Sequence, residues 1–166
     1  MKNIIPNAIL VLSFLLSNCN KSTTDTQHIN CDGLVTDTTG TNDQAKIYMP
    51  TAFTPNGDAL NDILHPAFSG ISSMTLTIYD DNNAVIFTTN QLNQGWNPLP
   101  IANSAIRYYY KIQATTTANH QVGECGEVYS LSCLPGNLSI SSLHFQDQLT
   151  QNGFTLTTHE VIQACH

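Results

Sequence analysis

Short segments of alternating apolar and polar residues, separated by Gly, Pro and Asn, constrain the fold of this chain most strongly. Residues 74–79 alternate with a period of two, and one face of this predicted strand carries Met74, Leu76 and Ile78. Residues 106–113 alternate in the same way. Their predicted inward face carries Ile106, Tyr108, Tyr110 and Ile112. Because no window is typical of an amphipathic helix, the pattern predicts an all-β protein, and specifically a β-sandwich.

Three further segments complete the predicted strands. Residues 47–53 contain a proline, which indicates an edge strand or a strand start. Residues 84–88 follow an Asp-Asp-Asn-Asn turn and form the second arm of a hairpin with 74–79, because Asn and Asp tolerate turn conformations. Residues 127–132 form the last clear strand.

The N-terminal sequence predicts export. Lys2 precedes an apolar run over residues 4–16, which has the length of a signal peptide and falls short of the about 20 residues that span a membrane. The run ends Leu-Ser-Asn-Cys19, which resembles a bacterial lipobox, although Asn18 stands where Gly, Ala or Ser is usual. We expect cleavage before Cys19 and lipidation of its thiol. The alternative is an ordinary secretory signal peptide that leaves Cys19 as a spare thiol.

This interpretation predicts a lipid-anchored protein of the cell envelope, at the outer membrane or cell surface. A single acyl chain binds a membrane only marginally, whereas several bind it stably. We expect the chain to divide as follows: 1–18 a lipoprotein signal peptide, 19–45 a flexible tether, 46–133 a β-sandwich, and 134–166 a C-terminal extension packed on or tied to the sandwich.

Four cysteines remain if Cys19 carries lipid, and an even number suits an oxidising compartment. Two disulfides then have three possible connectivities, of which we favour Cys31–Cys125 and Cys133–Cys165. The cysteines are too dispersed for a zinc site. The net charge of −7, with few scattered Lys and Arg, gives no basis for nucleic-acid binding.

Three segments together resemble the gliding motility-associated C-terminal domain, the type B sorting domain of type IX secretion. The first is residues 48–62, Tyr-Met-Pro-Thr-Ala-Phe-Thr-Pro-Asn-Gly-Asp-Ala-Leu-Asn-Asp; the second is 76–79 with 85–87 and 95–97; the third is 108–112 with 126–128. The residues that match the family motif are Pro50, Phe53, Thr54, Pro55, Asn56, Gly57, Asp58, Asn61, Asp62, Tyr79, Gly95, Trp96, Tyr108 and Tyr110.

The resemblance covers about residues 47–132 and implies an immunoglobulin-like antiparallel sandwich. In that family the domain is an address read by the export machinery. Here only the predicted tether precedes it, residues 134–166 continue beyond it, and Asp81-Asn82-Asn83 replaces the family's Arg-Trp-Gly turn. The Gly before the tyrosines is also missing, with residues 105–107 in its place. The fold therefore transfers more fully than the sorting role.

The loop of residues 56–62 is a candidate Ca²⁺ site. Its oxygen-bearing side chains are Asn56, Asp58, Asn61 and Asp62, and Ca²⁺ prefers such ligands. The loop lacks the distal bidentate Glu of a calcium loop, and the favoured alternative is an Asx-turn that shapes the start of the sandwich. Apart from this candidate we expect no cofactor.

No catalytic constellation is found in the sequence, and we expect a protein that is not an enzyme. His159-Glu160 begins like the zinc motif His-Glu-x-x-His, but Gln163 occupies the second ligand position. The expected function is surface attachment or secretion-related binding of proteins by an anchored sandwich. The alternative is a carbohydrate- or adhesion-type binding module, for which Trp96 and the tyrosine run would form an aromatic platform, although core packing is the favoured role of these rings.

Overall fold

The computed structural model describes residues 31–38, 42–150 and 153–166, and these form an all-β protein with two short 3₁₀ turns. The strands are β1 (Lys46–Tyr48), β2 (Ala52–Phe53), β3 (Ala67–Ser69), β4 (Ile71–Tyr79), β5 (Val85–Thr89), β6 (Ala105–Thr116), β7 (Gln121–Leu131), β8 (Leu149–Thr150) and β9 (Gly153–Phe154). The 3₁₀ turns are η1 (Ile140–Ser142) and η2 (Gln146–Gln148). The prediction of an all-β fold is confirmed.

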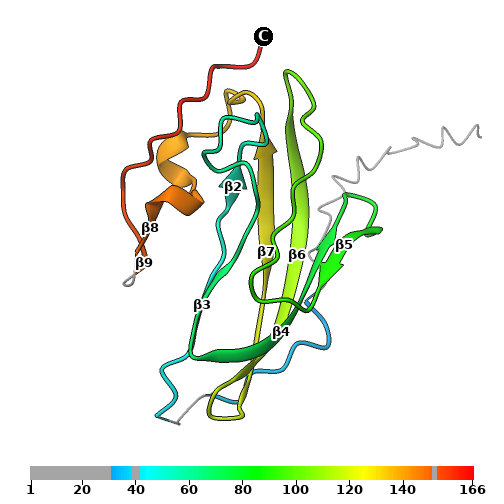
Figure 1. Ribbon diagram of the computed structural model, residues 1–166. Coiled ribbons are helices and arrows are strands. Elements are labelled where there is room, and N and C mark those ends of the chain that lie inside the picture. The colour runs from blue at the N-terminus through cyan, green and yellow to red at the C-terminus, as the bar shows by residue number, and fades with distance from the viewer. Residues whose placement is uncertain (1–30, 39–41, 151–152) are drawn as a thin grey trace, which may run out of the picture.

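The main sheet has five strands in the order β2-β7-β6-β4-β5 (Figure 1). The pairs formed by β4, β5, β6 and β7 are antiparallel, whereas β2 runs parallel to β7. The sheet is therefore mixed: the antiparallel arrangement expected from the sequence is found for β7-β6-β4-β5, and it is wrong for β2. The reason is that β2 and β7 lie far apart in the sequence and no hairpin joins them.

The segment 47–53 forms two strands rather than one. Residues 46–48 pair with β3, and residues 52–53 pair with β7 in the main sheet. Pro50 lies between them, fully buried, and a proline offers no N–H for a strand ladder. The chain thus crosses from one layer to the other at this proline, and β2 lies at the sheet edge, as expected for a proline-bearing segment.

The main hydrophobic core lies between the main sheet and the layer that contains β1 and β3. Leu76, Ile78 and Ile112 are fully buried in it, and Met74 and Tyr110 are nearly so. The predicted inward faces of β4 and β6 are therefore confirmed at these positions. Tyr108 packs against the same core, and Ile106 is only half-buried.

Tyr109 departs from simple alternation, since it is 3% exposed although it lies on the opposite face from Tyr108 and Tyr110. The guanidinium of Arg107 lies over its ring, 5.3 Å from the centroid. Such a cation–π contact stabilises an aromatic ring on the outer face of a sheet.

Residues 31–38 lie along the outer face of the main sheet. Cys31 forms a disulfide with Cys125, and the backbone N–H of Val35 donates to Gln113 Oε1 at 2.8 Å. The N–H of Asp37 donates to the carbonyl of Gln121 at 3.0 Å. This part of the predicted flexible tether is therefore fixed to β6 and β7.

The C-terminal extension, residues 134–166, covers the β2 edge of the main sheet (Figure 1). The carbonyl of His144 accepts the N–H groups of Thr51 and Ala52 at 2.8 and 3.2 Å. Leu143 and Phe145 are buried with Ala52 and Leu131 in a second hydrophobic cluster. The described residues contain no helix that is long and apolar enough to cross a membrane.

Candidate functional site

The loop of residues 54–62, which holds half of the residues that match the sorting-domain motif and is called the motif loop below, is folded around the carboxylate of Asp62. Its Oδ1 accepts the N–H groups of Asn56 and Gly57 at 2.9 and 2.6 Å, and its Oδ2 accepts that of Ala59 at 2.7 Å. Gly57 has a φ of 83°, in the region that favours glycine. The carboxylate thus satisfies three backbone donors that no strand or helix would satisfy.

The other side chains of the calcium candidate also make hydrogen bonds within the protein. Asn56 Oδ1 accepts the N–H of Asp58 at 2.9 Å, and Asp58 Oδ1 accepts that of Leu60 at 2.8 Å. Asn61 bonds to the C-terminal extension instead. The loop therefore has the Asx-turn geometry of the favoured alternative, and within the described ranges no three His, Cys, Asp or Glu side chains are grouped to bind a metal.

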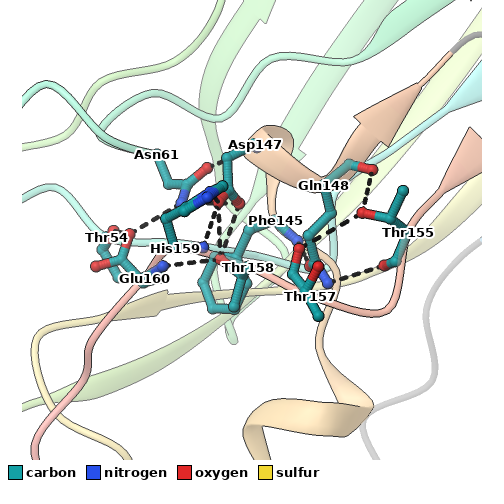
Figure 2. Close-up of polar contacts among 10 residues, drawn as sticks. All are labelled: Thr54, Asn61, Phe145, Asp147, Gln148, Thr155, Thr157, Thr158, His159 and Glu160. Carbon is teal, nitrogen blue, oxygen red and sulfur yellow. Dashed lines mark hydrogen bonds and ion pairs between the residues drawn. The ribbon is translucent and has the colours of Figure 1, made fainter.

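A buried polar cluster joins this loop to the C-terminal extension (Figure 2). Glu160 is 6% exposed, and its Oε2 accepts Thr54 Oγ1 at 2.7 Å and Asn61 Nδ2 at 2.9 Å. The Asn61 amide also donates to Asp147 Oδ1 at 3.2 Å, and its carbonyl oxygen accepts the N–H of Asp147 at 2.9 Å. Asn61 therefore connects two carboxylates of the extension to the motif loop.

Asp147 is the second carboxylate of this polar cluster. It accepts the hydroxyl of Thr158 at 2.8 Å and the N–H of His159 at 2.6 Å. Burial by itself raises the pKa of Asp147, but the hydrogen bonds from His159, Thr158 and Asn61 outweigh it and hold the pKa below its ordinary value of 3.8. Asp147 is consequently an ionised acceptor at neutral pH.

The roles of Asp147, Thr158 and Glu160 were not found in the sequence. In the sequence, Glu160 stands only in an incomplete zinc motif, and the neighbouring His159 has a side chain that is 86% exposed. The bonds to Asn61 and Thr54 span 86, 99 and 106 residues, so no local spacing marks them. The available signal was the pair Cys133–Cys165, which brings the end of the chain back to the sandwich.

The aromatic residues of the motif are packed together inside the domain. The Trp96 ring lies 5.7 Å from that of Phe53 and 4.8 Å from that of Tyr108, in the second case edge to face. Trp96 also bridges to Leu64 through two backbone hydrogen bonds of 2.9 Å. A Cβ on Gly95 would lie 2.8 Å from the Leu64 carbonyl, so this close approach requires glycine. Trp96 and Tyr108 are therefore half-buried residues that pack against the main hydrophobic core.

The remaining motif tyrosines lie on β4 and β6. Tyr79 ends β4, half-buried, and pairs with Tyr109. Tyr110 is buried, and its hydroxyl donates to Glu124 Oε1 at 2.9 Å. Both side chains belong to the sheet rather than to an open site.

A shallow pocket of about 250 Å³ opens beside the motif loop. Its lining residues are Pro55, Asn56, Gly57, Asp62, Asn97, Pro98, Leu99 and Pro100. Leu99 is 90% exposed and Ile101 is 56% exposed. We call residues 55–57, Asp62 and residues 97–101 the end surface. Exposed apolar side chains around a pocket are typical of a binding surface.

The cysteines of the described residues form two disulfides, Cys31–Cys125 and Cys133–Cys165, which are the pairs favoured from the sequence. Cys19, the predicted lipidation site, lies outside the described residues. The second disulfide ties the end of the extension to the end of β7, and the backbones of Leu134 and Ala164 form a parallel bridge beside it.

Comparisons with known proteins return no relative. No family model, no curated protein and no solved structure matches the chain.

Proposed function

We propose that this chain is an exported lipoprotein, anchored to the cell envelope through Cys19, whose sandwich binds proteins in surface attachment or secretion. The observation that carries the binding role is the end surface. Its pocket is open and lined by both apolar and polar residues, Leu99 in its lining is exposed, and Ile101, two residues further along the chain, is exposed as well. Isolated exposed apolar residues are common on protein surfaces, but their grouping around a pocket favours a docking role.

The proposed fold within the all-β class is an immunoglobulin-like sandwich related to the type B sorting domain. Two observations support this assignment. The motif residues Phe53 and Trp96 pack against each other in one core, and the loop around Asp62 is a defined structure rather than a variable connection. The assignment rests on the motif match, since the fold alone does not assign function.

The anchor is supported by the cysteine count. Four of the five cysteines are joined in pairs, and Cys19 is the fifth. The test is the intact non-reduced mass of the protein from the membrane fraction of an exporting bacterial host. A chain that starts at Cys19, with added acyl groups and four hydrogens fewer, is expected. An unmodified chain in the soluble fraction would remove the anchor from the proposal.

The binding role is tested by placing a photo-reactive amino acid at Leu99 in cells that export the protein. We expect a discrete protein adduct that mass spectrometry identifies as an envelope component. The matched control is Leu156, which is 96% exposed on the C-terminal extension and should give no such adduct. Equal adducts from the two positions would contradict docking at the end surface.

The alternative of carbohydrate binding receives less support from the geometry. A sugar site of this kind needs an aromatic face open to the ligand, and the rings of Trp96 and Tyr108 pack edge to face on each other. A glycan that bound the protein and shielded Trp96 fluorescence from a soluble quencher would restore this alternative.

A further inference from the structure

We propose that the pocket of the end surface receives a lysine or arginine side chain from an extended segment of the partner protein. This proposal rests on the protein-binding role above and specifies the chemistry of the partner. The pocket combines two kinds of lining: apolar walls from Pro55, Pro98, Leu99 and Pro100, and polar side chains from Asn56, Asp62 and Asn97.

The mixed lining matches a long basic side chain. Lys and Arg have an aliphatic stem that packs on apolar surface and a charged head that remains hydrated or bonds to oxygen. A purely apolar side chain would contact the prolines and Leu99 but would offer no hydrogen-bond partner to the polar side chains of the lining. An anionic side chain would be repelled by the carboxylate of Asp62.

Asp62 retains both charge and bonding capacity for such a head group. Its three bonds to backbone N–H groups use three of about four acceptor positions on a carboxylate. Backbone N–H groups are neutral, so none of these three partners is a counter-charge for the carboxylate. The exposed Asp58 adds a second negative charge on the same loop, four residues before Asp62 along the chain.

The protein supplies no cation of its own from this part of the chain. Residues 47–106 contain no Lys and no Arg, and the pocket lining contains one charged side chain, that of Asp62. The next basic residue, Arg107, is paired with Asp81 at 3.7 Å and with Glu127 at 3.6 Å. A basic partner is therefore the electrostatic complement of the end surface.

The experiment uses the full chain, expressed with its own N-terminus in an exporting host, labelled for NMR and held in detergent micelles. The probe is the peptide acetyl-Gly-Ser-Arg-Ser-Gly-amide, compared with the same peptide carrying citrulline, the neutral isostere of arginine. We expect saturable shifts of the amides of residues 97, 99 and 101, with the citrulline peptide about tenfold weaker, because hydrogen bonds to charged groups are stronger than neutral ones.

Two exposed-leucine variants make the test specific. Leu99→Lys should weaken arginine-peptide binding about tenfold by placing a like charge at the pocket, whereas Leu156→Lys should leave it unchanged. Equal binding of the two peptides, shifts confined to other residues, or no shift would overturn the proposal. If the Leu99 adduct still formed in cells, the protein-binding role would stand and only the basic side chain would be rejected.

Discussion

At the scale of single residues, Asn61 determines how the C-terminal extension meets the motif loop. It is 8% exposed, has a φ of 52°, and bonds to both Asp147 and Glu160. Asn adopts this backbone conformation more readily than most residues, and its amide both donates and accepts. The backbone conformation and the hydrogen bonding of the amide together explain why an asparagine occupies this position between two carboxylates.

The isosteric change Asn61→Asp tests this role. It removes the amide donor and places a third carboxyl group beside Asp147 and Glu160, so we expect the free energy of unfolding at pH 7 to fall by about 2 kcal/mol or more. Urea denaturation under non-reducing conditions measures the loss. Asn93→Asp, at an exposed position, is the matched control and should change stability by less than about 0.5 kcal/mol.

The lowered pKa of Asp147 predicts a pH dependence. The pKa of an aspartate in an unfolded chain is about 3.9, and the pKa of Asp147 in the folded protein is lowered. The stabilisation by ionised Asp147 is therefore fully present above the unfolded pKa and is lost as the pH falls through the folded pKa. We expect the stability difference between the wild type and Asp147→Asn to shrink between about pH 5 and about pH 2. A constant difference across this range would contradict the assignment. Comparison with the variant is necessary because Asp43, bonded by Thr116, also has a lowered pKa and contributes to the acid response of the wild type.

At the scale of elements, the pairing of β6 with β7 depends on Gly126. It lies opposite Tyr110 in the register, and a Cβ there would come within 2.7 Å of the tyrosine hydroxyl. Burial first, and then the negative charge of Glu124, raises the pKa of Tyr110, so its hydroxyl stays protonated and donates to that carboxylate. Because Gly126 on β7 has no side chain, the ring of Tyr110 on β6 can occupy the space beside it.

Gly126→Ala should displace the Tyr110 ring and weaken its bond to Glu124. Overpacking of this kind costs about 1–3 kcal/mol, and thermal unfolding measures it. Gly136→Ala is the matched control, because a Cβ there meets nothing within 4 Å and its φ is not positive. Equal melting temperatures for the two variants would show that the ring does not depend on the glycine.

At the scale of the whole molecule, the two disulfides hold the two ends of the described chain to one sheet. Cys31–Cys125 spans 94 residues and fixes residues 31–38 to the outer face, whereas Cys133–Cys165 spans 32 residues and closes the C-terminal extension. The extension also covers the β2 edge, and covering is one way in which proteins prevent a sheet edge from pairing with another chain.

Replacing both Cys133 and Cys165 by Ser should destabilise the protein by about 4 kcal/mol, the loop-closure value for a separation of 32 residues. Hydrogen exchange should show that the N–H groups of Thr51 and Ala52, which bond to His144, lose protection while those in the centre of β6 retain it. Uniform loss of protection across β6 would mean that the extension and the sheet unfold as one unit.

The features that depend on near neighbours along the chain can be predicted from the residue types alone. Alternation over residues 74–79 predicted which side chains of β4 face the core, the Asp-Asp-Asn-Asn turn predicted the β4–β5 hairpin, and Pro50 indicated a sheet edge. These features arise from backbone geometry within a few residues, which local residue types are sufficient to specify. The first half of β7 was missed because its glycines and polar residues hide the alternation.

The remaining features depend on contacts between segments that are distant in the sequence. Glu160 and Asp147 stabilise the fold because they accept hydrogen bonds from Thr54 and Asn61, which lie about a hundred residues away in the sequence. The pocket exists because the loops containing Pro55 and Leu99 lie side by side. The parallel pairing of β2 with β7 likewise joins distant segments. Burial and hydrogen-bond partners depend on how the whole chain packs, so the spacing of residues along the sequence does not predict them.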